Sequence, residues 1–307
     1  MRLLLLGADG QIGWQLRRSL AVLGEVVALT PDSKNLCGDL RRPDGLAQTL
    51  QAVRPDVVVN AAAYTAVDRA ETEPEAVFAI NAIACEALAR ETQKMGAWLV
   101  HYSTDYVYDG SGERPWVETD LTAPLGVYGK SKLAGDEAIA SLSSKYLILR
   151  TSWVYDSRGQ NFVKSILKAA ASRESLSVVA DQWGSPTHAA LIADITAHTL
   201  LKLSCHPAAE NLSGVYHLAA SGFTHWHAYA CFVIEQGLAC GLPLRVTPDK
   251  VQAISSAEYT AYARRPANSR LDTARLRETF GLSLAPWQDG VRAVVAELAG
   301  QSRFLNH

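Results

Sequence analysis

The sequence predicts an α/β protein with a doubly wound parallel sheet and a smaller C-terminal α/β lobe. Three observations support this fold class. Short apolar runs alternate with stretches in which apolar residues recur at helical spacing, the pattern of strands covered on both faces. The first apolar run ends in a glycine-rich loop. The alternation becomes irregular after about residue 152, within a chain of 307 residues that has room for about two domains.

The elements of the first half follow from this alternation. Residues 3–6 form an apolar run that is shorter than the core of a secretory signal and fits a buried strand. Pro74 opens the longest predicted helix, because a first helical turn tolerates proline. We expect strands at 3–6, 26–29, 56–60, 97–102 and 146–150, and helices at 12–23, from 43, at 74–92 and at 128–140.

The second half predicts a separate lobe that packs on the first. We expect one domain at residues 1–152 and a substrate-binding lobe at 153–307, with the chain crossing back to the first domain around 176–225. The predicted helices here are 161–172, 189–203, 225–237 and 287–298, and the predicted strands are 176–180 and 215–218.

Composition excludes several classes of function. The net charge of −2 provides no basic field for nucleic acid or an anionic membrane, and no apolar stretch approaches the roughly 18 residues of a membrane span. The five cysteines form no CxxC pair, which indicates reduced thiols and a cytoplasmic protein. His225 and His227 lack a third ligand at suggestive spacing, so we expect no structural metal.

A glycine-rich loop predicts a dinucleotide site. Gly7, Gly10 and Gly13 lie between the first strand and its helix. Glycines there permit a tight turn and close approach of backbone to phosphate, and the helix N-terminus favours a pyrophosphate. The context of strand, loop and helix indicates a Rossmann-type NAD(P)-binding domain rather than a plain turn.

Tyr128 and Lys132 stand four residues apart at the start of a predicted helix. Residues at this spacing share one helix face, and a nearby cation favours the phenolate, which makes tyrosine a better proton shuttle. Such a pair is common on solvated helix faces. Here the glycine loop and the segment Ser103-Thr104-Asp105 favour a catalytic interpretation.

These motifs together resemble the extended short-chain dehydrogenase/reductase family. The spacing GxxGxxG of the first loop, Gly38-Asp39-Leu40, and the segment at 60–65 are similar to its cofactor-binding segments. The resemblance implies that Thr104, Tyr128 and Lys132 are catalytic. It also implies a set of cofactor-binding residues: Gly7, Gly10, Gln11, Ile12, Gly13, Thr30, Asp39, Leu40, Ala61, Ala62, Ala63, Tyr64, Thr65, Tyr102, Tyr128 and Lys132.

The choice of cofactor depends on the end of the second strand. An acidic residue there would bind a ribose diol and favour NADH. The strand instead ends at Leu29-Thr30-Pro31, and Asp32 and Lys34 beyond it act in opposite directions. We therefore favour NADPH and keep NADH as the alternative.

Four longer segments are more specific. They lie at residues 102–110, 149–155, 181–187 and 265–272 and closely resemble segments of the dTDP-4-dehydrorhamnose reductases. This resemblance extends over nearly the whole chain. The resemblance implies hydride transfer to C4 of a dTDP-4-keto-6-deoxy-L-sugar, giving dTDP-L-rhamnose. Tyr128 would donate the proton and Lys132 would bind the nicotinamide ribose. Thr104, Asp105, Tyr128 and Trp153 would contact the substrate.

One position separates reduction from elimination. Related sugar-nucleotide dehydratases have Thr-Asp-Glu, whereas this chain has Tyr106 in the third place. Without that glutamate the acid–base pair for losing water is incomplete, so we expect a ketone reduction. Two alternatives stay open: reduction of another dTDP-4-keto-6-deoxysugar, and a non-catalytic role like that of the regulatory β subunit of methionine adenosyltransferase.

The resemblance also predicts a departure in assembly. Some bacterial members dimerise through magnesium held by glutamates, and the matching positions here are Gln15, Ala190 and Glu297. Neutral side chains are poor magnesium ligands. We therefore expect no magnesium-bridged dimer, and a monomer or a weak homodimer.

Overall fold

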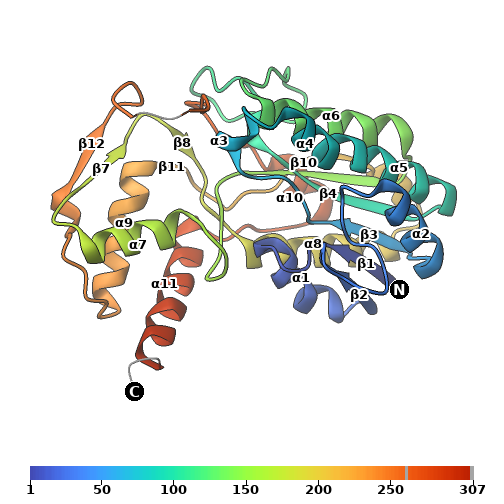
Figure 1. Cartoon of the computed structure of the whole chain (residues 1–307), viewed down its shortest axis with the longest axis horizontal. Helices are drawn as coiled ribbons and strands as arrows, with labels where there is room; N and C mark the ends of the chain where they lie inside the picture. Colours follow the sequence, from blue (N-terminus) through green and yellow to red (C-terminus); the bar gives the residue numbers. More distant parts are fainter. Residues whose placement is uncertain (260–261, 305–307) are drawn as a thin grey trace.

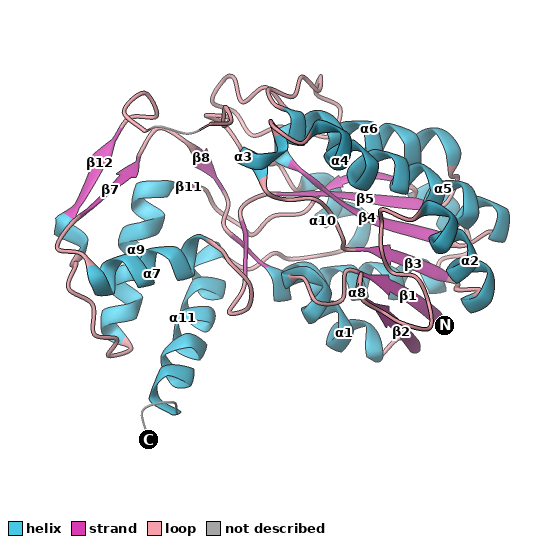
Figure 2. Ribbon diagram, viewed as in Figure 1, coloured by secondary structure: helices cyan, strands magenta, loops and turns pink. Residues whose placement is uncertain are grey.

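A computed structural model describes residues 1–259 and 262–304 and confirms the predicted fold class (Figures 1 and 2). Its centre is a six-stranded parallel sheet in the order β10-β5-β4-β3-β1-β2. The strands are β1 Arg2–Leu6, β2 Glu25–Leu29, β3 Val57–Asn60, β4 Trp98–Thr104, β5 Tyr146–Thr151 and β10 Gly214–His217.

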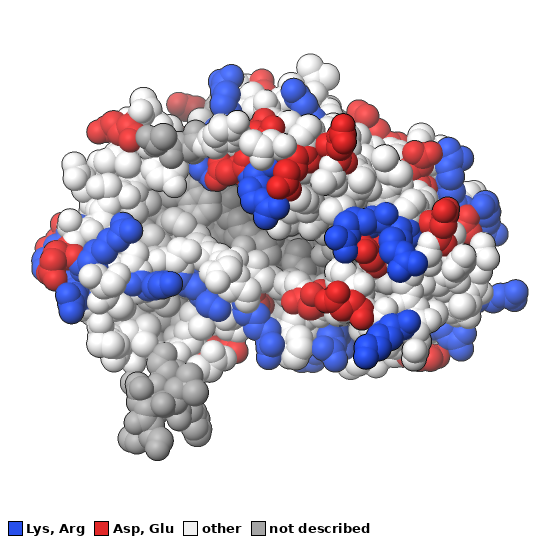
Figure 3. Space-filling model, viewed as in Figure 1, with Lys and Arg blue, Asp and Glu red and all other residues white. Residues whose placement is uncertain are grey.

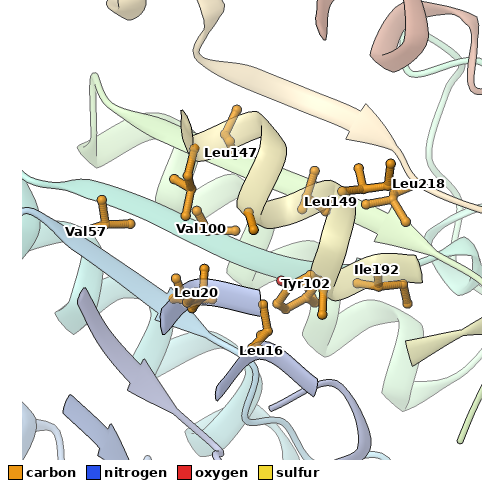
Figure 4. Packing of buried hydrophobic residues seen from close by; sticks show 14 of the residues in the cluster. Leu16, Leu20, Val57, Val100, Tyr102, Leu147, Leu149, Ile192 and Leu218 are labelled. Carbon is orange, nitrogen blue, oxygen red and sulfur yellow. The ribbon is translucent and has the colours of Figure 1, made fainter. Parts of the chain in front are cut away.

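Helices cover both faces of this sheet because successive strand residues point to opposite sides. Leu3 and Leu5 pack toward α1 (Gln11–Ala21) and α8 (Ala189–Cys205), and Figure 4 shows part of that cluster. Leu4 and Leu6 belong to the opposite core. That side is covered by α2 (Pro43–Val53), α5 (Ala84–Met95) and α6 (Val127–Leu142).

The helix expected at 74–92 contains an interruption. The structure has α4 at Pro74–Phe78, a π-helical turn η1 at Ala79–Ile83, and then α5. Asn81 in this turn accepts a hydrogen bond from the backbone N–H of Tyr64 and donates one to Ser131 on α6. Apolar periodicity does not reveal a π-helical turn, because its one extra residue barely changes the pattern over a long helix.

The second lobe is built from helices α7 (Phe162–Ser172), α9 (Trp226–Ala239) and α11 (Trp287–Phe304). A parallel pair, β7 (Leu176–Val179) with β12 (Val251–Ile254), lies at its outer edge (Figure 2). Between β7 and β12 the chain returns to the first domain, where β10 joins the six-stranded sheet and α8 packs beside α1. The boundary at residue 152 stays a prediction.

Sequence periodicity missed the short elements. These are α3 (Val67–Ala70), α10 (Ala274–Phe280), β12, the three-residue or four-residue turns η2 (Asp105–Val107), η3 (Ala209–Leu212) and η4 (Pro248–Lys250), and the two-residue strands β6 (Val154–Tyr155), β8 (Trp183–Gly184), β9 (Thr187–His188) and β11 (Thr224–His225). Such elements are too short to show a period. Within the described residues, none of the helices combines the length and hydropathy needed to span a membrane.

The packing of α6 generates a prediction about stability. A Cβ on Gly135 would collide with the backbone carbonyl of Asn81, whereas a Cβ on Gly300 of α11 would meet open space. We expect Gly135→Ala to lower the free energy of unfolding by about 1–3 kcal/mol through overpacking. Gly300→Ala, the matched control, should be neutral or raise it by up to about 1 kcal/mol. Urea unfolding measures both, and equal effects would contradict this view of α6.

Candidate functional site

The loop after β1 forms a narrow cradle. Gly7 has φ of +76°, and a Cβ there would lie 2.6 Å from the backbone nitrogen of Ala62. A Cβ on Gly13 would collide with the carbonyl of Gly7. Gly10 caps α1, which has neither a side-chain cap nor an acidic residue in its first turn. The open helix N-terminus and the close backbone fit a pyrophosphate.

A cleft of about 770 Å³ runs from this cradle along the carboxyl ends of the strands, where open α/β sheets bind their ligands. Figure 3 shows the hollow between the two lobes, with acidic and basic side chains mixed over the face around it. The sequence-predicted residues that line the cleft are Gly7, Gly10, Gln11, Ile12, Ala61, Ala62, Ala63, Thr65, Tyr102, Thr104, Asp105, Tyr128, Lys132 and Trp153.

Five predicted cofactor residues do not line this cleft. Gly13 and Leu40 are buried, and Leu40 packs in the core beneath α2. Tyr64 donates its hydroxyl hydrogen bond to Glu73 at 2.7 Å, and Asp39 pairs with Arg41. Thr30 donates its backbone N–H to Ser33, and its neighbour Pro31 lines the cleft instead. For Gly13 and Leu40, the structure indicates a packing role.

Tyr128 lies in the first turn of α6, beside the end of β4. Its ring packs edge-to-face on Tyr106, with 5.6 Å between ring centroids. Burial raises the pKa of Tyr128 to about 12, and a hydrogen bond with Thr104 acts in the opposite direction. The phenol is therefore neutral at physiological pH and holds a proton that it can donate. The pKa of Tyr128 is thus raised, whereas the sequence predicted that Lys132 would lower it.

The position of Lys132 accounts for that difference. Its side chain is almost fully buried, and its Nζ donates to the carbonyl of Tyr102 at 2.6 Å. The Nζ also lies 3.0 Å from Nε2 of His101. Burial lowers the pKa of Lys132. Lys132, which was expected to act on Tyr128, instead has its Nζ bound to residues of β4.

Asp105 is buried at the bottom of the cleft. Its Oδ1 accepts a hydrogen bond from Thr104 Oγ1 at 3.2 Å, whereas its Oδ2 has no hydrogen-bond partner in the described part of the chain. Burial raises the pKa of Asp105 to about 7. An unpaired carboxyl oxygen in a cleft is a site where a ligand hydroxyl can bind.

Trp153 forms the opposite wall. It has φ of +48°, an uncommon backbone conformation for a non-glycine residue, where the chain leaves β5. Its indole stacks on Trp226 at 3.6 Å between centroids and 14° between planes. A Cβ on Gly184 would lie 2.6 Å from the Trp153 ring, so glycine makes room for this indole.

Sequence reasoning missed several lining residues. They include Asp9, Pro31, Val67, Tyr106, Thr151, Val154, Gly159, Gln160 and Trp226. Trp226 had a sequence signal, since it stands in the segment His225-Trp226-His227. Gly159 and Gln160 had none, because their place depends on how the second lobe packs.

A buried polar network supports the site from behind. Asp136 on α6 accepts hydrogen bonds from Ser103 at 2.8 Å and from Arg150 at 3.2 Å. Arg150 also donates to the hydroxyl of Tyr108, which lies 2.7 Å from Nε2 of His217. The network ties α6 to β4, β5 and β10, and Arg150 offsets the cost of burying the Asp136 carboxylate.

The positions considered for magnesium make protein contacts. Gln15 donates to Asp156 at 2.8 Å, and Glu297 accepts from Ser157 at 2.8 Å. Ala190 has no ligand atom. Over residues 1–259 and 262–304, no group of three His, Cys, Asp or Glu side chains has a geometry suited to a metal ion.

The chain matches the family model of the RmlD substrate binding domain over residues 1–299. It is 48% identical to the dTDP-4-dehydrorhamnose reductase of Escherichia coli (strain K12), with 97% of this chain and 98% of that protein covered. The Bacillus subtilis (strain 168) spore coat polysaccharide biosynthesis protein SpsK is 36% identical, with coverage of 96% and 97%.

Solved structures are also similar. The dTDP-4-dehydrorhamnose reductase of Bacillus anthracis in complex with NADP has 34% identity and a TM-score of 0.85, with 96% of this chain and 99% of that chain covered. The Clostridium acetobutylicum reductase has 30% identity and a TM-score of 0.87, with coverage of 97% and 99%. A Streptomyces venezuelae dTDP-glucose 4,6-dehydratase, at 19% identity, shares the fold.

The buried Asp105 generates a prediction about pH. Its folded pKa of about 7 lies above the unfolded value of 3.8, so its protonation stabilises the fold at low pH. That stability is lost as pH rises from about 4 to about 7. Asp105→Asn should unfold like the parent at pH 4, and at pH 8 should be more stable by up to roughly 4 kcal/mol.

Denaturant unfolding at the two pH values measures this difference. Asp39→Asn is the matched control, because the pKa of Asp39 is lowered by Arg41 and its substitution should not stabilise the protein at pH 8. Equal stability of Asp105→Asn and the parent at pH 8 would contradict a buried, unpaired carboxylate.

Proposed function

The chain belongs to the RmlD substrate binding domain family, and from this membership we infer that it is an NADPH-dependent oxidoreductase, a dTDP-4-dehydrorhamnose reductase. It reduces the C4 ketone of dTDP-4-dehydro-L-rhamnose to give dTDP-L-rhamnose. The observation that carries this inference is that Thr104, Tyr128 and Lys132 line one cleft together with the glycine cradle.

The residues of the cradle suit NADPH. Gly7, Gly10 and the N-terminus of α1 would hold the pyrophosphate, because the backbone approaches closely and the helix dipole favours negative charge. When bound, the nicotinamide supplies the hydride. Lys132 would bind its ribose, since this residue of α6 lines the cleft.

We propose Tyr128 as the proton donor. Burial keeps its phenol protonated, and the hydrogen bond with Thr104 orients the hydroxyl and eases loss of the proton. When hydride adds to the ketone carbon, the ketone oxygen becomes an alkoxide, and this alkoxide takes the proton of Tyr128. Thr104 would hydrogen-bond the reacting oxygen or tune Tyr128, since its hydroxyl has one hydrogen to donate.

Asp105 and Trp153 are proposed to select the sugar. The unpaired Oδ2 of Asp105 would accept a sugar hydroxyl. The indole of Trp153 would pack on the apolar ring face and methyl of a 6-deoxysugar. Tyr106 occupies the place of the dehydratase glutamate and packs edge-to-face on Tyr128, which favours reduction over elimination.

A direct assay tests the reaction and its stereochemistry. Purified protein should oxidise NADPH when given dTDP-4-dehydro-L-rhamnose, and NMR of the product should show the rhamno configuration at C4. A different configuration would point to another dTDP-4-keto-6-deoxysugar reductase. Absence of turnover together with stable capture of a partner protein would favour the regulatory-subunit alternative.

Replacement of Tyr128 tests the proposed donor. We expect Tyr128→Phe to lower kcat about 10²-fold or more, the size of a general-acid contribution, with little change in the KM for NADPH. Tyr106→Phe is the matched control, because it removes a neighbouring phenol hydroxyl and keeps the ring contact. Near-normal turnover of Tyr128→Phe would exclude the assigned role.

We further propose a cytoplasmic protein that does not dimerise through magnesium. Two of the three relevant positions are Gln15 and Ala190, which offer no carboxylate. Light scattering after gel filtration should give the same mass, that of a monomer or a weak dimer, with magnesium and with EDTA. A dimer that dissociates only in EDTA would disprove this.

A further inference from the structure

Lys132 is held by strand β4. Its two contacts at Nζ, the Tyr102 carbonyl at 2.6 Å and His101 Nε2 at 3.0 Å, come from consecutive residues of that strand. Only 1% of the surface of each of Lys132 and His101 is exposed. An isolated pair of this kind in low dielectric must satisfy its donors and acceptors internally.

The cofactor loop determines which nitrogen of His101 carries a proton. The Oδ1 of Asn60 accepts the backbone N–H of Ala62 at 3.2 Å, which turns the Asn60 amide nitrogen toward His101. That nitrogen lies 3.2 Å from Nδ1 of His101. Because an amide NH₂ can only donate, Nδ1 accepts and bears no proton.

A neutral His101 therefore carries its proton on Nε2, which faces Lys132. An imidazole N–H pointing at an ammonium would place two donors opposite one another at 3.0 Å. The conflict disappears when Lys132 is an amine, whose lone pair accepts from His101. One amine N–H then donates to Tyr102, and one is left for the cofactor.

We propose that His101 is a positioning residue for Lys132: by donating Nε2–H to Nζ, it fixes the place of this lysine and favours its neutral form in the cofactor-free enzyme. The chain Ala62 N–H, Asn60, His101 and Lys132 links the backbone of the cofactor loop to the ribose-binding side chain. The contribution to activity rests on the proposed function, whereas the tautomer and the protonation state do not.

The surroundings of the pair agree with this assignment. Burial lowers the pKa of Lys132, and burial is also the largest cause that lowers the pKa of His101. The other titratable groups facing the pair are Cys85 from α5, whose Sγ lies 3.8 Å from Nδ1 of His101, and Asp136 from α6. Asp136 favours the ammonium, but it is already paired with Arg150.

NMR of the cofactor-free enzyme tests the tautomer without reference to catalysis. In protein with ¹⁵N-labelled histidine, we expect His101 to show a proton on Nε2, an unprotonated Nδ1, and no titration between about pH 6 and 8. Among the eight histidines, its signals are those lost in His101→Gln, or in His101→Asn if that variant alone folds. A proton on Nδ1, or titration in this range, would overturn the proposal.

Two substitutions test the contact with Lys132. The Gln side chain in His101→Gln places an amide group near the position of Nε2, whereas the shorter Asn reaches only that of Nδ1. We expect His101→Asn to raise the KM for NADPH about tenfold or more, and His101→Gln to keep it within about threefold. Equal KM values for the two variants would indicate a packing role and overturn the proposal.

The pH profile supplies the second readout. A glutamine oxygen can accept from an ammonium, so Lys132 should keep its proton to higher pH in His101→Gln. The basic limb of kcat/KM for NADPH, which follows the loss of that proton in the free enzyme, should therefore move to higher pH. An unmoved limb would refute control of the charge by His101. His227→Gln is the control, because Nε2 of His227 contacts the carbonyl of Val251 in the second lobe rather than Lys132; it should leave the KM for NADPH and the limb unchanged.

Discussion

The close approach of α6 to the end of β4 is the constraint on which the site depends. A Cβ on Gly129 would collide with the carbonyl of Tyr106 just after β4, so glycine there lets the helix lie this near, and Gly135 does the same for the contact of α6 with Asn81 in η1. Only at this distance does Lys132 reach the backbone of Tyr102. The spacing of Tyr128 and Lys132 therefore has chemical meaning because the helix has this partner.

Burial at that junction determines the electrostatics of the cleft. Desolvation is the largest cause of the shifts at Tyr128, Lys132 and Asp105, and each shift favours the neutral form. Burial also raises the pKa of Asp136, and the charge of Arg150, which pairs with it behind the cleft, acts in the opposite direction.

The sequence predicted the elements that are long or strongly patterned, because apolar runs and helical spacing survive in a single chain. The glycine loop and the Tyr128–Lys132 pair could be singled out for the same reason, and the structure places both at one cleft. Position did not predict electrostatics: Lys132 was expected to lower the pKa of Tyr128, and the structure shows it engaged with His101 instead. No spacing places His101 there, since that contact joins two elements about 30 residues apart.

The second lobe shows why the sugar cannot be read from sequence alone. Trp153 adopts φ of +48° directly after β5, and backbone strain of this kind, of order 1–3 kcal/mol, persists only where neighbours enforce it. Here the neighbours are Gly184 and Trp226, which lie 31 and 73 positions further along the chain. The indole that we propose to face the sugar is therefore oriented by tertiary packing. A change at Gly184 or Trp226 would alter the sugar-facing wall while every catalytic motif stayed intact, so selectivity for the sugar and competence for reduction can vary independently on this fold.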